Sequence, residues 1–193
     1  MTIMKTTFYF VRHAKVNKNN HDDMTRELSA EGFAERILVT NFLADKNIDI
    51  LLSSPYKRAV DTIADFAEKN DMEIRPIDDF RERKITDEWI ADFETYSKKQ
   101  WEDMNYKLKN GESLMEVQNR NIRALNCALE EYRGKNIVVG SHGTALSTVI
   151  NFFDKSFGYE DFNEISDIMP WIVKFVFEDD RCVEMEKVNL FES

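Results

Sequence analysis

The sequence predicts an α/β fold, a three-layer sandwich in which a mostly parallel central sheet carries helices on both faces. Two observations lead to this prediction. Short apolar runs rich in β-branched and aromatic residues alternate with longer segments of helical periodicity, as in strands joined by crossover helices. The chain also has no Pro-, Gly- or Ser-rich linker, no low-complexity tract and no internal repeat. We therefore expect residues 1–193 to form a single domain, since 193 residues is a usual length for one domain.

The first predicted strand spans residues 7–11, an aromatic and β-branched run that ends at an Arg-His pair. A polar loop to about Arg26 follows. Residues 29–46 then predict an amphipathic helix with Ser29 as its N-cap. The expected buried face of this helix consists of Phe33, Ile37, Leu38 and Phe42.

Residues 48–52 predict the second strand, and we expect a helix to begin immediately after it. In the Ser54-Pro55 pair, Ser is a favourable N-cap and Pro is preferred at the first helical position. Residues 72–77 predict a third strand. The positions of the intervening helix that should face the core are Ala59, Ile63, Phe66 and Ala67.

Residues from about 80 to 112 interrupt the alternation and predict a helical insertion. The segment is irregular and rich in charged and aromatic residues. We interpret its rings mainly as packing groups, some of which would define specificity if the insertion caps a pocket. The aromatic positions are Trp89, Phe93, Tyr96, Trp101 and Tyr106.

The last part of the chain returns to alternating strands and helices. Ser113 and Glu116 form a capping box, which predicts a helix that runs to about residue 132. Residues 136–139 predict the fourth strand, and the tight turn after it leads into a helix over residues 145–153. A closing hairpin is expected over residues 171–188.

The charge balance limits the classes of ligand. The chain holds 36 Asp and Glu against 26 Lys and Arg, a formal net charge of −10. This excess argues against nucleic acid, whose non-specific affinity comes from Lys and Arg on phosphates, and against an anionic membrane surface. It does not set the sign of a local pocket, because charges are screened beyond about 8 Å at physiological salt.

Cysteine usage and the N-terminal segment predict a cytoplasmic protein. Cys127 and Cys182 are the only cysteines and form no CxxC pair; one disulfide between them is an alternative, but we expect two free, mostly buried thiols. The apolar run that ends near residue 11 is too short for a signal peptide, and no cleavage site follows it. No stretch approaches the roughly 20 apolar residues of a membrane span.

Polar side chains follow four of the predicted strands. Arg12 and His13 follow the first strand, and Arg58 lies one turn into the helix after the second. Glu82 comes after the third strand and His142 after the fourth. Ligands of open parallel sheets bind beyond the carboxyl ends of the strands, so we expect these five side chains to share one rim.

Several segments at this rim resemble the motifs of the histidine phosphatase superfamily, which includes the cofactor-dependent phosphoglycerate mutases. They match that family in order and spacing over about residues 8–153. The resemblance implies an insertion that caps the active site. The matching segments are Phe10-Val-Arg-His-Ala14, Leu52-Ser-Ser-Pro-Tyr-Lys-Arg-Ala-Val-Asp-Thr62, Arg81-Glu82 and Val139-Gly-Ser-His-Gly143, with Gly111-Glu-Ser113 as a further family-like element.

The resemblance assigns a catalytic role to each of the five residues, and the chemistry agrees with it. His13 is the nucleophile that becomes phosphohistidine, and Arg12 and Arg58 grip the phosphoryl oxygens. His142 is a second imidazole that stabilises the transition state. Glu82 protonates the leaving oxygen and then activates the attacking water. No metal and no cofactor is implied.

Four further residues are expected to contact the substrate. Asn19 lies six residues after the nucleophile, where the family often places an Asn that reaches the phosphate. Ser141, Gly143 and Thr144 flank the second imidazole and would supply hydroxyl or backbone donors. We interpret His21 as an exposed loop residue that could touch substrate. The secondary anion contacts considered are Lys57, Arg83 and Lys84.

Other interpretations stay open for several of these residues. Each histidine could be a hydrogen-bonded structural residue, and Arg58 could be a solvated helix charge. Glu82 could belong to a charged surface loop, with Asp78 or Asp79 as the acid instead. We disfavour a metal site built from two His and one Glu, because the neighbouring arginines would repel the cation.

Departures from the mutase pattern favour a phosphatase that acts on a small phosphorylated metabolite. The first motif reads Arg-His-Ala-Lys where many mutases have Arg-His-Gly-Glu, and the segment after His142 also lacks the mutase pattern. Mutase-type phosphoryl transfer is the alternative. A protein phosphohistidine phosphatase and a non-catalytic phosphate-binding or interaction module rank below it. A homodimer is left open.

Overall fold

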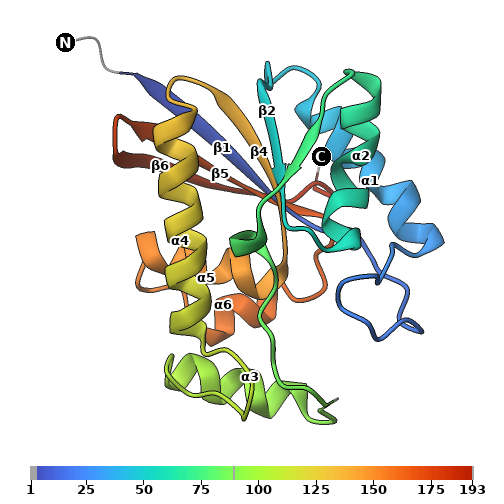
Figure 1. The fold of residues 1–193 in the computed structure, drawn as a ribbon, viewed down its shortest axis with the longest axis vertical. Helices are drawn as coiled ribbons and strands as arrows, with labels where there is room; N and C mark the ends of the chain where they lie inside the picture. The colour runs from blue at the N-terminus through green and yellow to red at the C-terminus, as the bar shows by residue number, and fades with distance from the viewer. Residues whose placement is uncertain (1–3, 89, 193) are drawn as a thin grey trace.

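The computed structural model describes residues 4–88 and 90–192. Within them the strands form one six-stranded sheet in the order β3-β2-β4-β1-β5-β6 (Figure 1). The first four strands of this order run parallel, and the last two form the predicted antiparallel hairpin, so the mostly parallel sheet is confirmed. The strands are β1 (Lys5–Arg12), β2 (Ile50–Ser53), β3 (Ile74–Pro76), β4 (Asn136–Ser141), β5 (Trp171–Glu178) and β6 (Arg181–Val188).

Helices cover both faces of the sheet, because alternate residues of its central strands are apolar on both sides. Phe8 and Phe10 of β1 pack with α4 and α5 in one core. Tyr9 and Val11 pack with α1 and α2 in the other core, and Figure 1 shows the two helix pairs on opposite sides of the strands. The three-layer arrangement is confirmed. The helices are α1 (Ala30–Leu43), α2 (Lys57–Lys69), α4 (Leu114–Glu131) and α5 (Gly143–Phe153).

The strand register brings three strand ends to one edge of the sheet. Arg12 at the end of β1 pairs with Ser141 at the end of β4, and Ser53 at the end of β2 pairs with Gly140. Because β4 lies between β1 and β2, the residues that follow these strands are neighbours. This edge is where the predicted functional residues should meet.

The buried face of α1 differs from the prediction. Ser29 is the N-cap as expected, and its side chain accepts the N–H of Gly32. Phe33, however, is 40% exposed, whereas Leu43 is fully buried. A Cβ on Gly32 would lie 2.0 Å from the Lys15 carbonyl oxygen, so the helix meets the preceding loop through this glycine and Phe33 turns outward.

The start of α2 also differs from the prediction. The helix begins at Lys57 with Tyr56 as its N-cap residue, and Ser54 lies before it. The Ser54 hydroxyl accepts the N–H of Tyr56 at 3.2 Å and is hydrogen-bonded to His142. Ser54 therefore contacts a residue of the predicted rim and does not cap α2. The four predicted core positions of α2 are buried.

Only part of the predicted helical insertion is helical. Among the described residues from 80 to 112, α3 (Phe93–Glu102) is the only α-helix; a short 3₁₀ turn, Asp78–Phe80, precedes a loop. Trp89 lies outside the described residues. A helix that we did not predict, α6 (Tyr159–Glu164), packs beside α3 at one end of the molecule (Figure 1). The capping box of Ser113 and Glu116 is confirmed at the start of α4.

Both cysteines are free thiols. Cys127 is exposed because it lies on the solvent side of α4, so the expectation of mostly buried thiols is wrong for this residue. No helix formed by residues 4–88 and 90–192 is long and apolar enough to cross a membrane.

Candidate active site

The two histidines that follow β1 and β4 meet at the sheet edge. The backbone N–H of His13 donates to the Ser141 carbonyl at 3.1 Å, and the ring centroids of His13 and His142 lie 5.4 Å apart. Both side chains are buried. The predicted pairing of the two imidazoles is therefore present.

His13 is held as a neutral imidazole with one free nitrogen. Its Nδ1 lies 2.8 Å from the Ala14 carbonyl oxygen. A carbonyl can only accept, so we assign the ring proton to Nδ1 and a lone pair to Nε2. Burial, and then the charges of Arg58 and Arg12, hold the pKa of His13 well below its ordinary value. A neutral ring with a lone pair on Nε2 is in the form that the predicted nucleophile requires.

In His142 the two ring nitrogens are used the other way round: Nε2 has a hydrogen-bond partner and Nδ1 has none among the described residues. Its Nε2 lies 2.7 Å from the Ser54 hydroxyl, while its buried Nδ1 has no hydrogen-bond partner among the described residues. Burial is the first cause of a lowered pKa for this ring, followed by the charge of Arg58. A buried nitrogen without a partner beside the predicted nucleophile is a candidate contact for a ligand atom.

Arg58 supplies a buried positive charge to the same site. Its side chain extends from the first turn of α2 and the residue is 3% exposed. Nη1 donates to the Asp23 carbonyl oxygen at 2.6 Å, and Nη2 lies 3.3 Å from the Asp23 carboxylate. The guanidinium also lies over the Tyr56 ring, 5.1 Å from its centroid. It is therefore positioned in advance of any ligand.

Arg12 is tied to the segment after α6. Its two terminal nitrogens donate to the carbonyl oxygens of Ile165, Ser166 and Ile168, while its buried Nε has no partner in the described part of the chain. Burial lowers the pKa of Arg12 to about 10. A Cβ on Gly143 would lie 3.1 Å from this Nε, so the absence of a side chain there gives the guanidinium its room.

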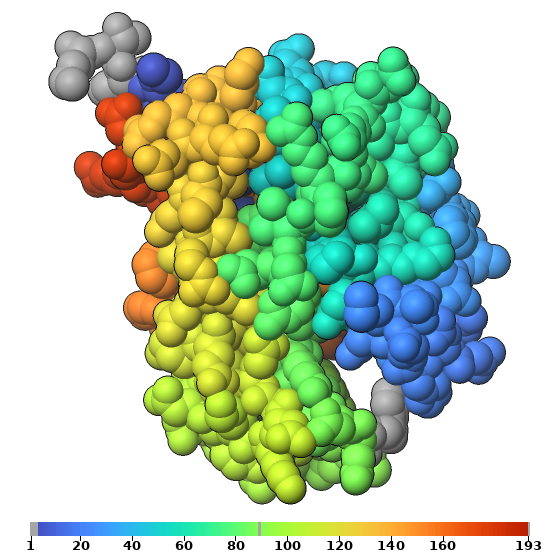
Figure 2. Space-filling view, viewed as in Figure 1, coloured from blue at the N-terminus to red at the C-terminus, as the bar shows by residue number. Residues whose placement is uncertain are grey.

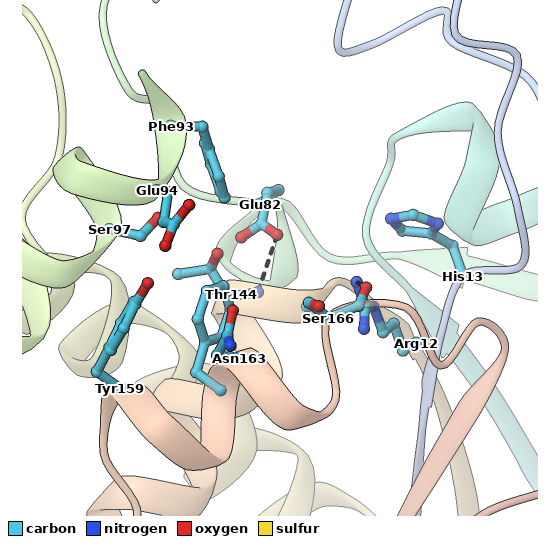
Figure 3. Close-up of a pocket in the computed structure, with 12 residues that line it drawn as sticks. Arg12, His13, Glu82, Phe93, Glu94, Ser97, Thr144, Tyr159, Asn163 and Ser166 are labelled. Atoms are coloured by element: carbon cyan, nitrogen blue, oxygen red, sulfur yellow. Dashed lines mark hydrogen bonds between the residues drawn. The ribbon is translucent and has the colours of Figure 1, made fainter. Parts of the chain in front are cut away.

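Glu82 sits on the N-terminus of α5. One carboxylate oxygen accepts the N–H of Thr144 at 3.0 Å, and the other accepts those of Ala145 and Arg83, at 3.0 and 2.8 Å. Figure 3 shows the carboxylate of Glu82 directed toward the start of this helix, with His13 to one side. The helix end fixes the position of the predicted acid.

Arg120 holds the segment that carries Glu82. This arginine is 5% exposed and donates to the carbonyl oxygens of Asp79, Arg81 and Glu82 at 2.8, 2.7 and 3.1 Å. It also forms an ion pair with Glu112 at 2.9 Å. Sequence reasoning missed Arg120, and its one signal is that Glu112 lies in the family-like Gly-Glu-Ser element.

Arg26 is a second residue that sequence reasoning missed. It comes from the polar loop after β1, where its Nε donates to the Asn20 carbonyl at 2.6 Å. Its charge is among the causes that lower the pKa values of His13 and Arg58. Nothing in the sequence separates it from the other charges of this loop.

Two cavities meet at His13, and both are also lined by Glu82, Phe93 and Thr144. The first, of about 310 Å³, extends toward α3 and α6, where Glu94, Tyr159 and Asn163 line it (Figure 3).

The second cavity, of about 520 Å³, lies between the loop after β1 and the segment before α3. Figure 2 shows the surface hollowed between these two segments. The second cavity is also lined by His21, Arg26, Arg58 and Arg83.

The remaining predicted residues divide into two groups. Gly143 and Thr144 line the first cavity. Asn19 is exposed and Ser141 fully buried, and neither is among the residues that line the two cavities, so the structure does not bring them into the site. His21 is exposed and lines the second cavity.

Within the described residues no group of three His, Cys, Asp or Glu side chains could hold a metal ion.

Comparisons with solved structures agree on the fold. The structure is similar to a mycobacterial glucosyl-3-phosphoglycerate phosphatase, with a TM-score of 0.76 and 17% identity over 95% of this chain and 97% of that chain. It is similar to a phosphoserine phosphatase from Entamoeba histolytica, with a TM-score of 0.73 and 21% identity over 93% and 96% of the two chains. It is also similar to YhfR from Bacillus stearothermophilus, with a TM-score of 0.75 and 18% identity over 92% and 94%. Comparison with curated proteins gives no match.

The family is identified by the sequence model of the histidine phosphatase superfamily (branch 1), which matches residues 8–182. The matched range includes all five residues of the rim, from Arg12 to His142. Because this match covers most of the chain, the protein belongs to branch 1 of the histidine phosphatase superfamily.

Proposed function

We propose that the protein is a phosphatase that hydrolyses small phosphorylated metabolites through a phosphohistidine on His13. The single observation that carries the proposal is the state of this ring. Its Nδ1 proton is bonded to a carbonyl, its Nε2 keeps a lone pair, and burial beside two arginines keeps it uncharged. Similar proteins with phosphatase names support the choice of reaction.

In the first step the Nε2 lone pair of His13 attacks phosphorus, and the bond from phosphorus to the leaving oxygen breaks. Arg58, the Nε of Arg12 and the Nδ1 of His142 stabilise the charge on the other phosphoryl oxygens. Glu82 in its protonated form gives its proton to the leaving oxygen. The products are a neutral alcohol and phosphohistidine.

In the second step water attacks the phosphohistidine. The bond from phosphorus to Nε2 breaks, and the lone pair returns to the ring. The Glu82 carboxylate takes the proton from the water, which restores its protonated form for the next turnover. Side chains of this chain stabilise the negative charge on the phosphoryl oxygens and transfer the protons in both steps, so the proposed mechanism needs no metal or cofactor.

Turnover of p-nitrophenyl phosphate in EDTA tests the reaction. We expect phosphate release with the chelator present, and an acid-labile phosphoenzyme that is absent from the His13→Ala variant. Loss of all activity in EDTA would overturn the metal-free mechanism, and full activity of His13→Ala would overturn the nucleophile.

Mutase-type transfer remains the second candidate because it shares the phosphohistidine step. Incubation with 2,3-bisphosphoglycerate and 3-phosphoglycerate separates the two reactions. Formation of 2-phosphoglycerate faster than phosphate release would favour the mutase. Screening phosphorylated metabolites for phosphate release then identifies the substrate.

We further propose a cytoplasmic, single-domain enzyme whose ligands do not include nucleic acid. The two free thiols and the net charge of −10 support this setting. A homodimer is compatible with it, and light scattering measures the oligomeric state directly.

A further inference from the structure

Glu94 is a carboxylate of the first cavity that makes no bond within the described chain. It lies in the first turn of α3, and it and Glu82 are the two carboxylates that line this cavity. Glu82 accepts three backbone N–H groups. By contrast, no hydrogen bond or ion pair within residues 4–88 and 90–192 involves the Glu94 side chain, although Lys98 lies four positions further along α3. The cavity therefore holds a negative charge that is open to a ligand.

Ser97 adds a buried hydroxyl without a partner to the same wall of the cavity. It lies three residues after Glu94, and residues three apart share one face of a helix. Ser97 is 1% exposed, and its Oγ has no hydrogen-bond partner among the described residues. An acidic residue in the first turn of a helix is favourable in itself, whereas a buried hydroxyl without a partner has a cost that a bond to a ligand removes.

The short helix α6 presents two further polar side chains from the opposite wall. Tyr159 and Asn163 both line the first cavity and lie four residues apart, so they share one face of α6. Figure 3 shows the Tyr159 hydroxyl and the Glu94 carboxylate directed into the space between α3 and α6. The pKa of Tyr159 is raised, first by burial and then by the charge of Glu94, so these two groups are close. Neither α6 side chain has a hydrogen-bond partner in the described part of the chain.

The four side chains are complementary to a hydrogen-bond donor that carries a positive charge. A carboxylate can only accept hydrogen bonds, and hydroxyls and an amide oxygen also accept them. Arg12 is the one Lys or Arg among the described residues that line this cavity, and it lies at the end that holds the proposed phosphate site. A primary ammonium group has three donors, no acceptor and a charge opposite to that of Glu94. This end of the cavity therefore fits an ammonium group and not a second anion.

Both walls are held in place before a ligand arrives. In α3, the Gln100 amide donates to the carbonyl oxygens of Tyr106 and Glu112 at 2.8 and 3.0 Å. The segment that follows α6 is held by Arg12, which donates to the Ser166 carbonyl oxygen at 2.9 Å. Walls fixed in this way lower the entropy that is lost when a ligand binds.

We propose that the side chains at this end of the first cavity form an ammonium subsite, and that the enzyme prefers phosphate monoesters of amino alcohols. The subsite consists of Glu94, Ser97, Tyr159 and Asn163. The inference rests on the proposed function and names the substrate class of the same site. The phosphate lies at His13, and the alcohol chain passes Glu82 toward α3, where its ammonium group meets the Glu94 carboxylate.

Binding to the His13→Ala variant tests the subsite without turnover. The probes are ω-aminoalkyl phosphates with chains of two to six carbons, each paired with the ω-hydroxyalkyl phosphate of the same length. At the chain lengths that span the cavity, calorimetry should give dissociation constants about fivefold lower for the amino member, the value of one partly exposed ion pair. The ratio of kcat/KM for each pair in the wild-type protein repeats the comparison if the variant is unstable.

Substitution of Glu94 identifies the group responsible. In the same background, Glu94→Gln should reduce the preference for the amino members to below about twofold, and Glu94→Lys should reverse it, because the charge of the subsite is reversed. Glu160→Gln is the matched control and should leave the preference intact. It removes an exposed carboxylate from the first turn of α6 that does not line the cavity.

Ser97→Ala separates a bond to the ligand from a packing role. Its hydroxyl has no partner in the described structure, so its removal breaks no internal hydrogen bond and should not lower the unfolding temperature. Binding of the amino members should still weaken about threefold, while the hydroxy members change less.

Three results would overturn the subsite: equal affinity for both members of every pair, tighter binding of the hydroxy members, as a site for polyols predicts, or a preference that Glu94→Gln leaves unchanged. Failure of the proposed function looks different. In that case the wild-type protein releases no phosphate from any ester, while the preference for the amino members and its dependence on Glu94 are still measured by calorimetry.

Discussion

The hydroxyl of Ser54 lies 2.7 Å from Nε2 of His142, which leaves Nδ1 as the ring nitrogen without a partner in the described structure. The same hydroxyl oxygen accepts the N–H of Tyr56 at 3.2 Å. Its hydrogen is therefore free to be donated to Nε2, and we assign the ring proton of neutral His142 to Nδ1. We therefore propose that Ser54 is a positioning residue, which orients the Nδ1 donor of His142 toward the phosphoryl group of a substrate.

Ser54→Ala should lower kcat roughly five- to tenfold, the value of one hydrogen bond, with little change in KM. Ser53→Ala is the matched control, because the Ser53 hydroxyl is buried and has no partner among the described residues. Steady-state kinetics with p-nitrophenyl phosphate measure both variants. Equal losses in the two variants would contradict a positioning role for Ser54.

Loss of Arg120 should impair proton donation more than phosphoryl attack. Arg120 acts through Glu82, so Arg120→Met should reduce turnover of an alkyl phosphate about tenfold more than turnover of p-nitrophenyl phosphate, whose leaving group needs no proton. Arg123→Met, on the same helix but exposed, is the control. A loss of equal size for both substrates would instead indicate general destabilisation, which thermal unfolding measures independently.

Gly143→Ala should weaken the phosphate site. The added Cβ would lie 3.1 Å from Nε and Nη2 of Arg12, so the guanidinium must shift. We expect kcat/KM to fall about ten- to a hundredfold, as misplacement of a catalytic group commonly does. Gly158→Ala, whose Cβ would meet its nearest neighbouring atom at 3.9 Å, is the control. Wild-type kinetics in Gly143→Ala would show that Arg12 does not contact the substrate.

Stability should fall as the pH drops below about 6.5, the ordinary pKa of His. The pKa values of His13 and His142 are lowered by burial, so between the ordinary and the lowered values the unfolded chain binds more protons than the folded one. Each ring then contributes at most about 1.4 kcal/mol of unfolding free energy per pH unit, a contribution present above that window and lost as the pH falls through it. Urea titrations at several pH values measure the slope.

Replacement of one ring provides the control for this pH dependence. His142→Gln removes one of the two buried imidazoles and should make the unfolding free energy less dependent on pH in the same window. Asn19→Ala changes an exposed residue that does not titrate and should keep the wild-type slope. An unchanged slope in His142→Gln would contradict the lowered pKa of that ring.

The sheet and the rim could be predicted because they depend on local patterns. Apolar runs that alternate with helical segments identify the strands, and parallel strands bring their carboxyl ends to one edge of the sheet independently of the loop conformations. His13, Arg58 and His142 follow directly from those ends. The position of Glu82 was also expected, but its role as a cap on α5 depends on a contact between distant segments.

Contacts between segments explain what could not be predicted. Phe33 is exposed because Gly32 meets the Lys15 carbonyl in the loop that precedes the helix, a contact that helical periodicity does not reveal. Arg26 reaches the site through the fold of a polar loop, and Arg120 through bonds to backbone atoms of residues about 40 positions earlier. In each case the sequence shows the residue type but not its neighbour.

The contact between Arg58 and Asp23 has a consequence for product release. The guanidinium donates to the Asp23 carbonyl and faces its carboxylate before any phosphate is present. In the proposed mechanism an arriving phosphoryl group exchanges one anionic partner of Arg58 for another, so Arg58 contributes to the affinity only the difference between the two. We therefore expect orthophosphate to gain less from Arg58 than from Arg12 and His142, which would limit inhibition by the product.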